Sequence, residues 1–331
     1  MNKYILILSF ISMTLFSCLS TSDYAEEVPL IKLSAKEHIT GTYDSLFMGK
    51  IMSLFAFEDH IYMSDIDNDR ILRFDSQLQF KETIARQGRG PCEVISPLHL
   101  YRDKYALYAY DPGNLRLNIY ANNHSLCQSV SFSTWVTRFA IDDGQIYFSD
   151  PMQTYPISIQ PLNGDSIHQF GEFIEPAHGG EIKNYNYQHL LLSSSKHLYG
   201  IYTAQPMIKK YTTQGEKLTE LDLSTNNFIK SNTANAKKKI AQDPSRKKTI
   251  YNMFPDTYFY NNKLFLLTIN HINGEVFCNK IFVIDCAENS LKLTQILELE
   301  DGWYQSLCVY ENSLLAYNAT AGELQRFDLP N

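Results

Sequence analysis

The sequence has no excess of basic residues and none of the short motifs that mark common catalytic sites. Its 331 residues include 29 lysines and arginines against 36 aspartates and glutamates, a net charge of −7. A chain of this charge has no global basic field, so we expect no nucleic-acid partner. The motifs GxSxG and HExxH and the phosphate-binding glycine loop are missing. The sequence therefore predicts no catalytic residue, cofactor or resident metal.

Glycine and proline are modest in number, whereas aromatic residues are abundant. The chain has 15 glycines and 12 prolines against 22 tyrosines and 19 phenylalanines, and 44% of its residues are hydrophobic. Tyrosine and phenylalanine favour strands, and this much apolar material is enough for a large core. The composition predicts an all-β domain, which we place at residues 28–331.

The N-terminus carries a targeting signal. Lys3 is followed by an apolar stretch, residues 4–16, which is too short to span a bilayer. The sequence Leu15-Phe16-Ser17-Cys18 resembles a bacterial lipobox. The resemblance implies a signal peptide at 1–17, a lipid on Cys18, and a flexible tether at 18–27. Because Leu19 and not aspartate follows the cysteine, the outer membrane is the expected location. The alternative is an ordinary secretory signal with an incidental cysteine.

One pattern recurs along the chain and is clearest at residues 60–75, where two apolar strand segments flank an Asp- and Asn-rich turn. Similar units, each with an inner strand, a tight turn and further strands, follow one another. We assign six units, at residues 52–85, 98–132, 137–170, 190–223, 257–299 and 305–329.

Six such units predict a six-bladed β-propeller. The last unit contains only three strands, so we expect the apolar segment 28–33 to close that blade from the N-terminal side. An insertion at 226–255 separates units four and five; residues 234–242 favour a helix, which Pro244 ends.

The first unit and its exit resemble a known repeat. Ser64-Asp65-Ile66-Asp67-Asn68-Asp69-Arg70-Ile71-Leu72-Arg73-Phe74-Asp75 is similar to the NHL repeat, and Gly88-Arg89-Gly90-Pro91-Cys92-Glu93 with Ser96-Pro97 is similar to its inter-blade connection. With the lipobox, the chain resembles the six-bladed propeller lipoproteins of Bacteroidetes, of the NHL-like or TolB-like kind.

Ligand-binding candidates come from the loops that a propeller gathers around one end of its central channel. Amides, carboxylates, arginines and tyrosines there suit the recognition of carbohydrate or peptide. The alternative is that the Asp and Asn residues only form turns. The candidates are Asp67, Asn68, Asp69, Arg70, Arg86, Arg89, Glu93, Asn114, Arg116, Tyr155, Tyr202, Asn270 and His271.

Apart from Cys18, the cysteines show no metal-binding or redox spacing. Cys278 and Cys286 could bridge adjacent strands, although unpaired thiols are the alternative. The triplet Asp65-x-Asp67-x-Asp69 lacks the glycine and the glutamate that an EF-hand loop needs, so a calcium loop of that kind is rejected.

The insertion is basic although the chain is acidic. It contains Lys237-Lys238-Lys239 and Arg246-Lys247-Lys248. This run is either a solvated helix face or a patch for an anionic glycan, a lipid head group or an acidic partner.

Together these features predict a cell-envelope lipoprotein that acts as a ligand-binding or scaffold propeller for a glycan, a peptide or an envelope protein. A hydrolase, lactonase or lyase with a metal or acid–base site at the central channel is the alternative, and a structural partner of an outer-membrane transport complex is a third possibility.

Overall fold

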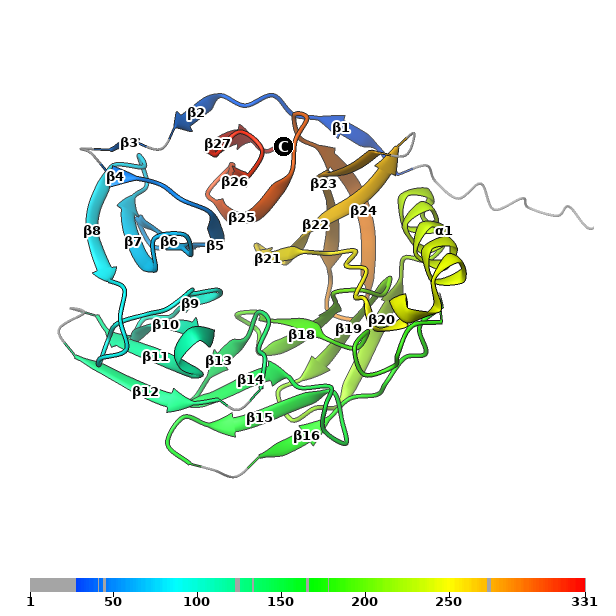
Figure 1. Ribbon diagram of the computed structural model, residues 1–331, viewed down its shortest axis with the longest axis horizontal. Coiled ribbons are helices and arrows are strands. Elements are labelled where there is room, and N and C mark those ends of the chain that lie inside the picture. Colours follow the sequence, from blue (N-terminus) through cyan, green and yellow to red (C-terminus); the bar gives the residue numbers. More distant parts are fainter. Residues whose placement is uncertain are drawn as a thin grey trace, which may run out of the picture.

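The computed structural model describes residues 28–40, 42, 43, 46–122, 126–132, 134–164, 167–177, 179–272 and 275–330. The predicted signal peptide, the lipidation site Cys18 and the predicted tether lie outside these residues. Within them, six β-sheets are arranged as blades around a central axis, which confirms the predicted propeller (Figure 1).

Each blade is built on consecutive antiparallel strands, of which the innermost comes first, and two blades gain a further strand from the N-terminal segment. Blade one contains β5 (Ile51–Phe57), β6 (His60–Asp65), β7 (Arg70–Asp75) and β8 (Phe80–Ala85). Blade two contains β9 (Leu100–Arg102), β10 (Ala106–Asp111), β11 (Arg116–Ala121) and β12 (Cys127–Ser131). Blade three contains β13 (Ala140–Asp142), β14 (Gln145–Ser149), β15 (Ile157–Pro161) and β16 (His168–Phe170). Blade four contains β17 (Gln188–Leu192), β18 (His197–Tyr202), β19 (Met207–Thr212) and β20 (Lys217–Asp222). Blade five contains β21 (Asp256–Tyr260), β22 (Lys263–Ile272), β23 (Glu275–Cys286) and β24 (Leu291–Glu298). Blade six contains β25 (Tyr304–Tyr310), β26 (Ser313–Asn318) and β27 (Glu323–Asp328).

The core is a ring of apolar clusters between neighbouring blades. Leu54 of blade one, Leu267 of blade five and Leu307 of blade six pack in one cluster, and each is fully buried. Tyr199 of blade four packs with Phe282 of blade five in another. Because both faces of each sheet are covered by a neighbour, the middle strands contain nearly continuous runs of buried residues.

An N-terminal strand closes the last blade, but it is not the segment that the sequence suggested. Strand β2 (Glu37–Thr40) pairs antiparallel with β27 and completes blade six. The predicted segment, 28–33, contains β1 (Leu30–Lys32), which pairs parallel with β24 and adds a fifth strand to blade five. Both run along the outer rim (Figure 1). Blade six lies next to blade one, so the segment just before blade one in the chain, β2, is the one that closes it. The more apolar β1 comes earlier in the chain and lies against blade five. A short hairpin, β3 (Thr42–Tyr43) with β4 (Leu46–Phe47), separates β2 from β5.

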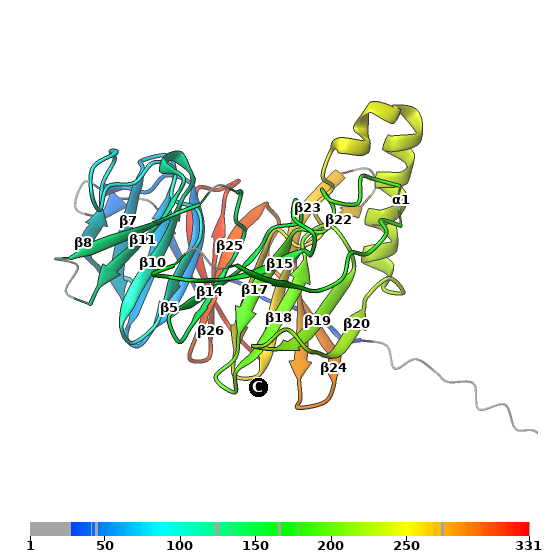
Figure 2. The same ribbon diagram turned by 90° about the horizontal axis from the view of Figure 1, so that it is seen from below.

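The insertion forms helix α1 (Asn227–Gln242), followed by the short 3₁₀ helix η2 (Pro244–Lys248). The helix begins seven residues before the predicted start at residue 234, because the Asn226 side chain caps it by accepting from the Phe228 N–H. Ile229, Ala236 and Ile240 bury one face of the helix. Figure 2 shows α1 at the edge of the ring, rising beyond one face of the disc. A second 3₁₀ turn, η1 (Pro112–Asn114), lies between β10 and β11.

Among the residues that the structure describes, no helix is long and apolar enough to cross a bilayer.

The suggested bridge between Cys278 and Cys286 is wrong. Both residues lie on β23, and eight residues of extended strand separate their Cα atoms by about 27 Å. A disulfide needs Cα atoms closer than about 7 Å. All five cysteines from Cys92 to Cys308 are free.

A buried ion pair crosses the central axis. Arg138, just before β13, donates to both carboxylate oxygens of Asp256 on β21, and the bond from Nη2 to Oδ2 is 2.8 Å long. Asp256 also accepts from the Leu307 N–H of β25 at 2.9 Å. Both charged side chains are almost fully buried, 3% and 1% exposed. The pair therefore links blades three, five and six through the middle of the ring.

This pair yields a stability prediction. Asp256→Ala leaves the Arg138 guanidinium buried without its counter-charge, so we expect the free energy of unfolding to fall by about 3–5 kcal/mol. The double variant Arg138→Met with Asp256→Leu removes both charges and keeps volume, and should recover most of that loss. Urea denaturation measures both values. If the free energy of unfolding of Asp256→Ala lay within about 0.5 kcal/mol of the wild-type value, as for most surface substitutions, the prediction would be contradicted.

Candidate functional site

A cavity opens at one mouth of the central channel, on the face at which the innermost strands begin. We call this face the entry face. The cavity has a volume of about 520 Å³ and receives residues from all six blades and the connections that lead into them. Its lining consists of Met52, Leu98, His99, Trp135, Thr137, Asn184, Tyr187, His189, Thr203, Ile250, Asn252, Pro255 and Gln305.

The fold explains why these residues meet. Met52, His189 and Gln305 lie near the starts of β5, β17 and β25, and most of the others lie in the connections just before an innermost strand. All innermost strands begin on the same face and next to the axis, so residues far apart in sequence converge there (Figure 1).

Two histidines occupy the cavity wall. The rings of His99 and His189 meet edge to face, with centroids 6.0 Å apart. His189 has both nitrogens occupied, Nδ1 facing the Arg138 N–H at 3.4 Å and Nε2 facing the Phe254 carbonyl oxygen at 3.1 Å. His99 is 8% exposed, and its Nδ1 is buried without a hydrogen-bond partner among the described residues. His99 therefore retains unused hydrogen-bonding capacity at the site.

Both histidines are neutral at neutral pH. Burial lowers the pKa of His99 well below its ordinary value, and the positive charge of Arg138 lowers it further. Burial also lowers the pKa of His189 to about 4, against the opposing effect of the Asp256 carboxylate. The lining contains no Asp, Glu, Lys or Arg, and the Arg138–Asp256 pair beside His189 is internally neutralised. The cavity therefore suits a ligand, or a part of one, that carries no charge.

Unpaired amides and an exposed indole complete the site. The side chains of Asn252 and Gln305 make no hydrogen bond within the described part of the chain. Trp135 is 53% exposed at the rim, although large apolar side chains are usually covered. An amide both donates and accepts, and an indole offers a flat apolar surface. Together they can orient and stack a polar ring.

The residues predicted from sequence also lie on the entry face, but none of the thirteen lines the channel-mouth cavity. In blade one, Asn68 and Arg70 both bind the buried Asp65 carboxylate, and Arg70 pairs with it at 2.8 Å. Asp67 accepts from the Lys50 N–H at 2.9 Å, and Asp69 accepts from the Ser96 N–H at 2.6 Å.

Blade two repeats this arrangement with the same spacing. The buried Asp111 carboxylate accepts from Asn114 at 2.8 Å, from Arg116 at 3.2 Å and from the Ile95 N–H at 2.9 Å. Arg116 also donates to the carbonyl oxygens of Gly90 and Glu93. Each Asp-x-x-Asn-x-Arg group thus clamps the connection that enters its own blade, which agrees with the turn-forming alternative.

The remaining candidates are scattered. Arg86 and Arg89 are exposed, and Tyr155 is 49% exposed on blade three. The Glu93 carboxylate accepts from the Gly90 N–H, the Tyr202 hydroxyl donates to the Glu172 carbonyl, and Asn270 bonds Asn279. His271 faces Asn235 of α1 and lines a second cavity beside the helix. That these residues bind a ligand stays a prediction.

Sequence reasoning missed the channel-mouth residues because none belongs to a motif. A positional signal was nevertheless present. The predicted units begin at residues 52, 98, 137, 190, 257 and 305, and the lining includes Met52, Leu98, Thr137, His189, Pro255 and Gln305. Taking the residues at the start of each unit would have located the site.

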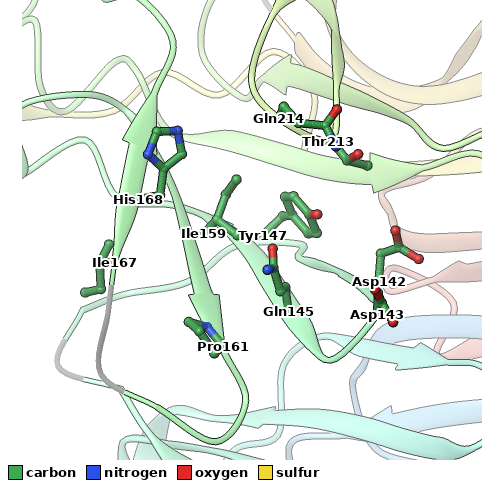
Figure 3. Close-up of a pocket in the computed structure, with 10 residues that line it drawn as sticks. All are labelled: Asp142, Asp143, Gln145, Tyr147, Ile159, Pro161, Ile167, His168, Thr213 and Gln214. Carbon is green, nitrogen blue, oxygen red and sulfur yellow. The ribbon is translucent and has the colours of Figure 1, made fainter.

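Another cavity, of about 560 Å³, lies on the opposite face between blades three and four. Figure 3 shows the Asp142 and Asp143 carboxylates at one end and the His168 ring at the other. Asp142 already pairs with Lys196. Only the turns and strands of two adjacent blades form this cavity, so it lacks the convergence that marks the channel mouth.

Comparisons with known proteins support the fold. No protein-family model and no curated protein matches the chain. Among solved structures, it is similar to a candidate exported protein of Bacteroides fragilis, with 12% identity, coverage of 91% of this chain and 100% of the other, and a TM-score of 0.58. It is also similar to a DUF4221-family member from Bacteroides vulgatus, with 12% identity, coverage of 89% and 97%, and a TM-score of 0.57.

Virginiamycin B lyase from Staphylococcus aureus is a further similar structure, with 13% identity, coverage of 87% of this chain and 82% of the lyase, and a TM-score of 0.52. At these identities the likeness shows the propeller fold, which has Bacteroides proteins among its neighbours, and leaves the activity open.

The Asp111 clamp yields a prediction. Asp111→Ala leaves the Asn114 and Arg116 side chains without their shared acceptor, so we expect a loss of about 3–5 kcal/mol in the free energy of unfolding. The control Asp59→Ala removes an exposed carboxylate whose one bonded partner among the described residues is Tyr310, and should cost about 0.5 kcal/mol. Guanidinium denaturation of both variants provides the test, and equal losses would refute the role of the clamp.

Proposed function

We propose that the protein is a lipid-anchored binding propeller of the bacterial cell envelope that holds an uncharged sugar unit of a glycan at the channel mouth. The observation that carries the proposal is a cavity of about 520 Å³ to which all six blades contribute and whose lining has no charged side chain. The lipobox-like sequence ending at Cys18 and the similarity to a candidate exported Bacteroides protein support the envelope location.

A sugar fits this chemistry better than a peptide or a protein partner. Sugar hydroxyls donate and accept, as do the unpaired amides of Asn252 and Gln305, and the apolar face of a sugar ring can stack on Trp135. Peptide termini and many side chains bring charges that this cavity does not pair. A folded protein partner needs about 800 Å² of contact surface, far more than a recessed mouth offers.

The catalytic alternative has less support. One similar structure is a lyase, and a lyase of the same kind has a catalytically inactive histidine-to-alanine variant. In this chain His189 uses both ring nitrogens within the fold, and the depressed pKa values of both histidines make them poor proton donors at neutral pH.

The test is calorimetric titration of residues 19–331 with a panel of neutral oligosaccharides built from glucose, mannose, galactose, xylose and N-acetylglucosamine. We expect saturable binding of at least one member, weakened about tenfold or more by Trp135→Ala because the stacking surface is lost. The control Tyr105→Ala removes a 68% exposed aromatic on the opposite face, and should bind like wild type.

Three results would refute the proposal: no binding across the panel, equal affinity of wild type and Trp135→Ala, or cleavage of a panel member in place of a stable complex. Chromatography of the titrated mixtures detects cleavage.

A further inference from the structure

A second cavity on the entry face adjoins the channel mouth. It has a volume of about 320 Å³ and lies between α1 and the segment that leads into β21. Ile250 and Asn252 line both cavities, so the two share a wall. The lining residues place both cavities on the entry face, and Figure 2 shows α1 rising beyond one face of the disc. The two cavities are therefore immediate neighbours on the entry face.

The second cavity differs from the first in charge. Its lining includes Lys239 and contains no Asp or Glu. The Lys239 ammonium lies 5.7 Å from the centre of the Tyr251 ring, and no carboxylate pairs with it among the described residues. His271 is the other titratable lining group besides Tyr251, and burial together with the charge of Lys239 lowers its pKa. At neutral pH the Lys239 ammonium is thus the one charged group in the lining of this cavity.

The surroundings strengthen the positive potential. The insertion at 226–255 holds seven lysines and arginines but one acidic residue, Asp243, within a chain of net charge −7. Asp243 pairs with Arg246 at 3.3 Å, so it does not neutralise Lys239. Lys230, Lys237 and Lys238 are exposed on the helix. An anionic group near α1 is therefore favoured, and the mouth of the channel adds no opposing charge.

One polar group in the second cavity is left unsatisfied. Asn232 is 6% exposed, and its carbonyl oxygen Oδ1 has no partner among the described residues, while its amide nitrogen donates to the Ile269 carbonyl. A buried acceptor of this kind is costly unless a donor reaches it. Asn232 lines the second cavity, so a donor for this oxygen would come from a group inside that cavity, such as a sugar hydroxyl.

From these contacts we infer that the ligand is an acidic glycan, which places a neutral unit against Trp135 and a carboxylate or sulfate against Lys239. The inference rests on the proposed function, because it takes the channel mouth as the first subsite. Lys239 lines the cavity, whereas Lys230, Lys237 and Lys238 do not. A glycan entering the cavity and a membrane lying on the helix would consequently depend on different lysines.

The experiment uses residues 19–331 and pairs of oligosaccharides that differ only in charge: tetragalacturonate with its methyl ester, and glucuronate-containing tetrasaccharides with their carboxyl-reduced forms. We expect at least one acidic member to bind about tenfold tighter than its neutral partner at low salt. The reason is that its carboxylate gains one charge-assisted contact with Lys239. Raising the salt concentration should reduce this advantage.

Two lysine variants separate the cavity from the general charge of the helix. Lys239→Gln should abolish the preference for the acidic form, whereas Lys238→Gln, its exposed neighbour, should keep most of it. Equal effects of the two variants would indicate nonspecific attraction of polyanions and overturn the inference. So would equal affinity for the two members of every pair, or retention on phosphatidylglycerol vesicles without binding of any acidic oligosaccharide.

The Trp135→Ala variant distinguishes the two possible failures. If neutral oligosaccharides bind in a Trp135-dependent manner but their acidic partners gain nothing, the inference about the second subsite fails and the proposed function stands. If neither form binds, both fail.

Discussion

The buried Arg138–Asp256 pair is the interaction on which the site depends. A six-bladed ring leaves space along its axis, and here a charged pair bonded to the β25 backbone fills part of that space. The pair is costly to desolvate, so it is stable only when the two groups meet with good geometry. It joins blades on different sides of the ring. Burial lowers the pKa of both nearby histidines; the guanidinium lowers that of His99 further, whereas the Asp256 carboxylate opposes the shift at His189. The uncharged character of the channel mouth thus follows from a lining without Asp, Glu, Lys or Arg and from the burial of its two histidines.

Much of the fold could be predicted from the sequence because propeller units repeat. The turn at residues 66–69 and its counterparts recur at similar spacing, so six inner strands could be placed within a few residues. The closing strand was harder to predict. Segment 28–33 is more apolar than Glu37–Thr40, yet closure is decided by which segment lies next to blade six, and apolarity does not report that position. The helix start was missed for a similar reason, since Asn226 acts as its cap through local geometry.

The site was less predictable than the fold. The residues chosen from sequence, such as Asn68, Arg70, Asn114 and Arg116, are conspicuous polar residues, and the fold uses them to clamp connections through Asp65 and Asp111. The channel mouth instead uses a tryptophan, two histidines and amides of no distinctive spacing. Their chemistry arises from convergence at the axis, and a linear pattern does not display which residues converge. The entry face therefore divides into structural turns at its periphery and unsatisfied groups near its centre.

A crystal structure of residues 19–331 grown with the tightest-binding oligosaccharide tests the central claim most directly, namely that the channel mouth is the binding site. We predict a sugar ring stacked on the Trp135 indole, within hydrogen-bonding distance of Asn252 or Gln305. A sugar held beside Asp142 and Asp143 on the opposite face, with nothing at the channel mouth, would contradict the claim.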